Sequence, residues 1–175
     1  MPRFQQAVLT TAYLPPAEYF YAIAHSGRVL IEQCETYLKQ SYRTRCRIFS
    51  SQGMETLSIP VLHPSAEGGS PGRIPIRDVR IDYGDPWIVR HKRALEASYN
   101  SSAFFPYYKD AIFSVFDRRE TFLFDLNLLL LEKILSLLGL KADIVLTDEF
   151  RQKYDEGDFR ERIQPKYRGK SLLEE

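Results

Sequence analysis

Two short apolar runs near the start of the chain are separated by enough residues for one helix. Ala7–Leu9 and the apolar part of Arg28–Gln33 are suited to buried strands, and Pro15 and Pro16 interrupt regular structure between them. Residues Ala17–His25 are predicted to form the intervening helix. Strands joined through a helix run parallel, so the chain is predicted to open with a βαβ unit.

A second β element is predicted after this unit. Arg43–Ser50 and Glu55–Leu62 flank a polar connection that contains glycine, and apolar and polar residues alternate along the latter segment. This pattern indicates a hairpin with one buried face. His63–Pro75 is rich in proline and glycine and is predicted to be an exposed, mobile loop, and Val79–Ile81 is predicted to be a short strand.

Helical patterns dominate the second half of the chain. Helices are predicted from Asp85 onward, over Phe104–Phe116 and over Arg119–Leu138, where a glycine follows. Ile144–Leu146 is predicted to be a last strand. Arg151–Glu175 is dense in charge and poor in core residues, so we expect a surface arm or a disordered tail.

These elements predict an α/β fold, with α+β as the alternative: a mixed β-sheet from the N-terminal half packed against a C-terminal group of about three helices. The 175 residues, 44% apolar and 27% charged, are enough to bury one core, and one domain is predicted over residues 1–150. Lys and Arg number 24 against 23 Asp and Glu, so no overall field attracts nucleic acid.

A cytoplasmic location is expected. Cys34 and Cys46 are too few for a disulfide framework, and the N-terminus shows no export signal. The most apolar stretch, Thr121–Leu140, carries charged residues whose transfer into a bilayer would be costly, which favours a core helix. No spacing typical of a metal site, a P-loop or a nucleotide-binding glycine motif occurs, so no metal or cofactor is expected.

The segment around Tyr42 is the most informative for function. Lys39, Arg43, Arg45 and Arg47 bring four positive charges without one acidic residue among them, and the three arginines would share a strand face. Arginine forks hold carboxylates or phosphates through two hydrogen bonds, which favours an anionic ligand such as a diphosphate. The alternative is a solvated strand face whose arginines pair with nearby Asp or Glu.

His91 shares a helical face with Trp87 and could act as a general acid or base near neutral pH. The alternative is a histidine at the edge of the core that is hydrogen-bonded to a backbone group. The aromatic run Phe104–Tyr108 could stack on a base or sugar, although rings at this density more often fill a core. Asn127, on an apolar helix face, could orient a site residue or tie two elements together.

The order of several weak motifs resembles the WbqC-like family over roughly residues 8–150. The residues that carry the resemblance are Tyr13-Leu14-Pro15, Tyr19-Phe20, Lys39, Tyr42, Arg45-Cys46-Arg47-Ile48, Ser58-Ile59-Pro60-Val61, Trp87, His91, Ser98-Tyr99 and Phe104-Phe105. The family's usual amide-bearing residues at positions 10, 12, 44 and 46 are replaced in this chain.

The resemblance implies a part in the biosynthesis of bacterial surface polysaccharide such as O-antigen. The chain would be a transferase that acts on a nucleotide-activated sugar, an anionic small molecule; the alternative is a non-catalytic glycan-binding or assembly component. In the first hypothesis His91 is catalytic and shares a site with the ligand-binding residues Tyr13, Lys39, Tyr42, Arg45, Arg47 and Trp87. A homodimer is left open.

Overall fold

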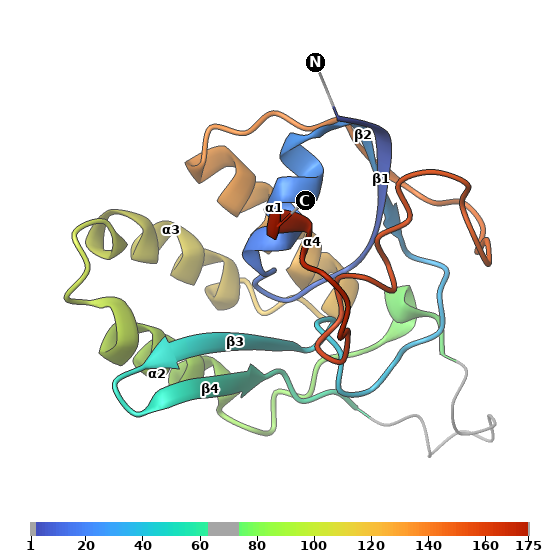
Figure 1. Ribbon diagram of the computed structural model, residues 1–175. Helices are drawn as coiled ribbons and strands as arrows, with labels where there is room; N and C mark the ends of the chain where they lie inside the picture. Colours follow the sequence, from blue (N-terminus) through green and yellow to red (C-terminus); the bar gives the residue numbers. More distant parts are fainter. Residues whose placement is uncertain (1–2, 63–73, 175) are drawn as a thin grey trace.

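The computed structural model describes residues 3–62 and 74–174 (Figure 1). The predicted βαβ unit is confirmed: β1 and β2 are parallel and are connected through α1 (Ala17–Ala24). A third parallel strand joins the free side of β2, so the strand order is β1-β2-β5. The strands of this sheet are β1 (Phe4–Thr10), β2 (Ser26–Glu32) and β5 (Ile144–Leu146).

The predicted hairpin forms a separate antiparallel sheet of β3 (Arg45–Ser50) and β4 (Gly53–Ser58). Gly53 has a φ of +110°, a conformation that glycine adopts readily at a tight turn. Cys46 and Ile48 are buried while the residues between and beyond them are more exposed, as expected for a strand with one buried face. The fold is mixed α+β, the alternative that the sequence left open, and the parallel and antiparallel strands form two sheets where one mixed sheet was predicted.

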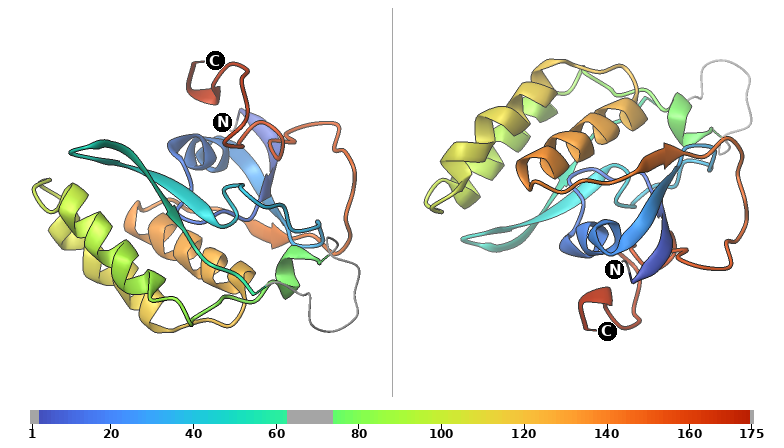
Figure 2. Two further views of the ribbon diagram at one scale, coloured as in Figure 1. Left: turned by 90° about the horizontal axis from the view of Figure 1, so that it is seen from below. Right: turned by 90° about the horizontal axis from the view of Figure 1, so that it is seen from above.

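Three longer helices follow: α2 (Trp87–Tyr99), α3 (Phe105–Asp117) and α4 (Leu123–Leu137). Figure 2 shows them gathered on one side of the molecule, with α1, β1 and β2 on the other side and the hairpin between the two groups. Helix α2 packs against β3 and α3, and α3 packs against α4. Leu126 and Leu130 of α4 are fully buried, so the most apolar stretch is a core helix as predicted.

The strand predicted at Val79–Ile81 is wrong. This segment follows a short 3₁₀ helix, η1 (Ile76–Asp78), and makes only isolated bridges, Val61 with Ile81 and Arg80 with Phe122. Each neighbouring segment pairs with it through a single residue, so no continuous β-ladder forms. Most of the predicted loop, residues 63–73, lies outside the described residues.

The C-terminal segment, residues 151–174, packs along the edge of β1 (Figure 1, orange-red to dark red). Val8 donates its N–H to the carbonyl of Gly157, and Phe159 donates to the carbonyl of Val8. Three of its apolar residues are buried, although the composition predicts few core residues there: Phe159, Ile163 and Leu172. The segment therefore covers a strand edge that would otherwise expose unpaired backbone groups.

Candidate functional site

A pocket of about 240 Å³ lies between the β3–β4 hairpin and the C-terminal segment. We call it the basic pocket, because four of its lining side chains are cationic and none is acidic. The residues that matter for its chemistry are Tyr42, Arg45, Arg47, Thr56, Lys166 and Arg168.

The four cations of the basic pocket, Arg45, Arg47, Lys166 and Arg168, form no ion pair within the described part of the chain. The alternative of a strand face whose arginines pair with Asp or Glu therefore does not describe Arg45 and Arg47. Guanidinium and ammonium groups around one cavity are suited to a phosphate or carboxylate ligand.

Strand geometry explains how β3 supplies two of these cations. Successive side chains point to opposite faces, so Arg45 and Arg47 stand on the outer face while Cys46 and Ile48 are buried on the other. The prediction that Arg43 shares the outer face is wrong. Arg43 precedes β3, is 4% exposed, and forms a two-point ion pair with Glu35.

Tyr42 and Lys39 differ in their relation to the basic pocket. Tyr42 is half-buried and lines it, and its backbone carbonyl accepts a hydrogen bond of 2.8 Å from the N–H of Tyr13. Burial raises the pKa of the Tyr42 hydroxyl, although the nearby Arg47 opposes the rise. Lys39 is exposed and does not line this pocket.

The remaining predicted residues, Tyr13, Trp87 and His91, form a cluster inside the core. The Tyr13 hydroxyl lies 2.8 Å from Nδ1 of His91, and the His91 and Trp87 rings are 5.1 Å apart in an edge-to-face arrangement. His91 is 3% exposed and also hydrogen-bonds the backbone of Ser58. A neutral imidazole satisfies both partners, because it accepts from the Tyr13 hydroxyl at Nδ1 and donates to the Ser58 carbonyl from its other nitrogen.

Burial and, to a smaller extent, the positive charge of Arg90 together lower the pKa of His91 to about 4, against smaller opposing effects of the Ser58 backbone and Asp85. The imidazole is therefore neutral near pH 7. Both ring nitrogens already have protein partners, so neither is directed at a cavity. This geometry matches the alternative of a hydrogen-bonded core histidine.

The hairpin separates the two groups of predicted residues. Ser58, which bonds His91, is paired with Arg45 in the β3–β4 register. Helix α2 carries His91 and packs against the buried face of the hairpin, whereas Arg45 and Arg47 stand on the outer face. The structure thus brings Tyr42 together with the two arginines, and it places His91 behind the strand that carries them.

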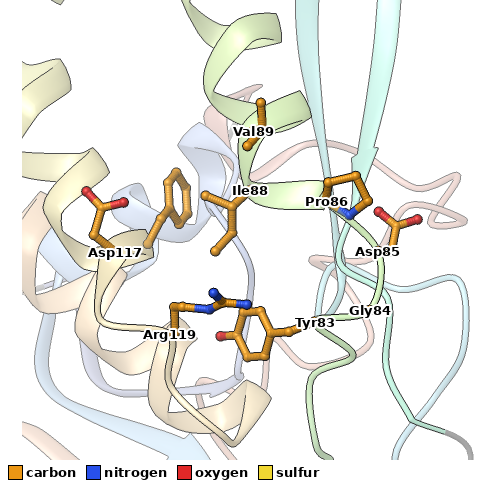
Figure 3. Close-up of a pocket in the computed structure, with 9 residues that line it drawn as sticks. Tyr83, Gly84, Asp85, Pro86, Ile88, Val89, Asp117 and Arg119 are labelled. Atoms are coloured by element: carbon orange, nitrogen blue, oxygen red, sulfur yellow. The ribbon is translucent and has the colours of Figure 1, made fainter.

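A second pocket, of about 340 Å³, lies at the start of α2 and is lined by none of the predicted residues (Figure 3). Arg119 lies over the ring of Tyr83, with its guanidinium carbon 4.9 Å from the ring centre. Asp85 and Asp117 on its walls pair with cations of α2, at 2.6 Å and 2.5 Å. Because two carboxylates and a single cation, Arg119, line it, this pocket is a weaker candidate for an anionic ligand than the basic pocket.

Sequence reasoning missed Lys166 and Arg168, which come from a segment interpreted as an arm or tail. The alternating cations Lys166, Arg168 and Lys170 were the available signal, since they repeat the spacing of Arg45 and Arg47. Their position opposite β3 depends on how the C-terminal segment packs. Within residues 3–62 and 74–174, no group of His, Cys, Asp and Glu could hold a metal ion, and no helix has the length and apolarity to cross a membrane.

Comparison with known proteins supports the resemblance seen in the sequence. An uncharacterised protein of Mycobacterium tuberculosis is 33% identical over 137 residues, which cover 78% of this chain and 57% of that protein, so this chain spans little more than half its relative's length. No solved structure matches the chain. The model of the WbqC-like protein family matches residues 11–171, which include both the β3 arginines and the C-terminal cations, and the chain therefore belongs to this family.

Proposed function

We propose that the protein binds the diphosphate of a nucleotide-activated sugar in the basic pocket and takes part in the biosynthesis of a surface polysaccharide. The observation that carries the proposal is a cavity lined by four cations that, among residues 3–62 and 74–174, have no ion-pair partner and no carboxylate beside them in the lining. At about 240 Å³ the pocket is smaller than a typical pocket for a whole drug-sized ligand, so it suits the phosphates while the rest of the ligand extends beyond it. A cytoplasmic location fits the free thiols of Cys34 and Cys46.

A transferase and a non-catalytic binding component remain the two forms of this proposal, and one observation favours the binding form. The basic pocket is lined by no histidine or carboxylate, and burial raises the pKa of its Cys46 thiol to about 12. No lining side chain is thus suited to accept a proton at neutral pH. His91, the proposed general base, stands behind the hairpin.

Binding is tested by isothermal titration with UDP, GDP, dTDP and their hexose conjugates at two salt concentrations. We expect one nucleotide series to bind, more weakly at high salt, because surface charges are screened. Loss of a charge-assisted hydrogen bond costs about 1.5–3 kcal/mol, so Arg45→Ala should weaken binding about ten- to a hundredfold. Arg93→Ala removes an exposed arginine of α2 outside the pocket and serves as the matched control.

Unchanged affinity in Arg45→Ala, or no binding by any nucleotide, would contradict the proposal. Catalysis is tested separately by following release of the nucleoside diphosphate in the presence of candidate sugar acceptors. Turnover that falls by about two to four orders of magnitude in His91→Gln, with nucleotide affinity retained, would support the transferase form. Turnover that survives in His91→Gln would remove the proposed catalytic role of this residue.

A further inference from the structure

A third cavity, of about 350 Å³, is lined by residues 34–38, Arg43 and the C-terminal part of the chain, and we call it the mixed-charge pocket. It differs from the basic pocket in having acidic as well as basic side chains in its walls. The residues that carry the argument are Glu35, Arg43, Phe150, Asp158, Arg160 and Glu161. Of the four basic residues that the sequence predicts for an anionic ligand, Arg43 lines this pocket.

The mixed-charge pocket lies at the carboxyl end of the parallel sheet, the usual position of ligands in folds of this kind. Glu32 ends β2 and is fully buried, and its Oε1 accepts hydrogen bonds of 2.8 Å from the Cys34 N–H and the Thr147 hydroxyl. Its Oε2 accepts from Arg160 at 3.4 Å. Thr147 directly follows β5, so hydrogen bonds connect the ends of two strands to Cys34 and Arg160, which line the pocket.

Arg160 is held rigidly in this wall. Its Nε and Nη2 donate to the two oxygens of Asp158 at 2.9 Å and 2.7 Å, and Nη1 donates to the carbonyl of Arg151 at 2.9 Å. Burial by itself would raise the pKa of Asp158, but the hydrogen bonds from Arg160 lower it below its usual range. Asp158 is therefore a fixed carboxylate at neutral pH.

Arg43 presents a donor that the protein leaves without an acceptor. Nε and Nη2 of its guanidinium donate to Glu35, whereas Nη1 is buried and has no hydrogen-bond partner among the described residues. The side chain is 4% exposed, so this N–H group lies away from bulk solvent. A buried donor without a partner is costly.

The side chains of the mixed-charge pocket fit a polyhydroxyl ligand better than a phosphate. Three carboxylates, of Glu35, Asp158 and Glu161, face two guanidinium groups, so the walls carry a net negative charge. A sugar hydroxyl donates to a carboxylate and accepts from a guanidinium, which uses both kinds of group at once. Phe150 is 54% exposed at this pocket, and its ring offers an apolar face for the C–H side of a sugar.

The two pockets have no lining residue in common, but neighbouring parts of the chain line them. Consecutive residues Tyr42 and Arg43 line the basic and the mixed-charge pocket respectively, and the C-terminal segment supplies Lys166 to one and Glu161 to the other. We propose that the mixed-charge pocket binds the sugar ring of a nucleotide sugar whose diphosphate occupies the basic pocket. The inference rests on the proposed function and adds a recognition site for the sugar.

The test compares each nucleoside diphosphate with its hexose conjugate by isothermal titration. We expect the conjugate to bind at least tenfold more tightly than the diphosphate alone. Phe150→Ala combined with Glu161→Gln should abolish that gain and leave the affinity for the diphosphate unchanged. Both residues are exposed, so the double variant should fold, and Tyr107→Ala removes a comparably exposed ring on α3 as the control.

The outcomes separate this inference from the proposed function. Binding of the diphosphate with no gain from the hexose, or a gain that survives in the double variant, would overturn the inference and leave the basic pocket intact. If no nucleotide binds, free monosaccharides at millimolar concentration test the pocket alone by saturation-transfer NMR. A saturation-transfer signal that disappears in the double variant would support the sugar site. The absence of a signal with any monosaccharide would overturn the inference.

Discussion

Lowering the pH should destabilise the protein through His91, and the size of the effect follows from the burial of the ring. The pKa of His91 is lowered from 6.5 to about 4 in the folded protein. The unfolded chain therefore binds a proton more readily than the folded protein does. The contribution of His91 to the free energy of unfolding is fully present above about pH 6.5 and is lost as the pH falls from about 6.5 toward 4.

The magnitude comes from the proton-binding equilibria of the two states. With pKa values of 6.5 and about 4, protonation should remove about 2 kcal/mol of the free energy of unfolding between pH 7.5 and pH 5. For a chain of 175 residues this corresponds to a fall in Tm of about 4–8 °C. The main structural cause is burial, which removes the charged imidazolium from water, and the positive charge of Arg90 adds to this cost.

Urea unfolding followed by circular dichroism at pH 7.5, 6 and 5 measures the effect. His91→Gln cannot titrate in this range, so the variant should be less stable at pH 7.5 and lose about 2 kcal/mol less than the wild type on going to pH 5. His25→Gln, which alters the half-buried histidine after α1, is the matched control. Equal pH dependence in the wild type and His91→Gln would refute the reasoning.

Two further predictions concern the C-terminal segment. Gly157→Ala should destabilise the protein by about 1–3 kcal/mol, because φ is +68° and a Cβ would lie 1.9 Å from the Gln6 carbonyl oxygen. Thermal unfolding measures this loss. The control Gly139→Ala should lose less stability, because φ there is +65° but no atom lies within 4 Å of the added Cβ. Arg160→Met should cost about 3–5 kcal/mol in urea unfolding, because the buried Glu32 loses its cationic partner; an equally stable variant would show that Glu32 needs no such partner.

The sequence by itself determined the elements whose pattern is local. Alternation along β3 and the apolar spacing of α4 depend only on whether one face of each element is buried. The proline pair before α1 and the glycines after β3 and α4 mark boundaries by their own backbone preferences. For the same reason the outward placement of Arg45 and Arg47 could be predicted before the fold was known.

Only the tertiary structure decided which faces meet. Arg43, Arg45 and Arg47 are two residues apart, a spacing that places side chains on one face of a strand. Arg43 is nevertheless buried in an ion pair with Glu35 and does not lie on the outer face of the hairpin. His91 was predicted to share a site with the arginines, whereas packing of α2 on the inner face of the hairpin directs it to Tyr13. The hydrophobic pattern of one element predicts that a side chain is buried, but it does not predict which residue of another element that side chain contacts.

The C-terminal segment shows the physical reason most directly. Its composition is that of a solvated arm, but backbone pairing with Val8 and burial of Phe159 fix it against β1. That contact delivers Lys166 to the basic pocket and Arg160 to the mixed-charge pocket. Such contacts join residues far apart in the chain, and their free energy comes from surfaces that exist only after the sheet has formed, so no local pattern encodes them.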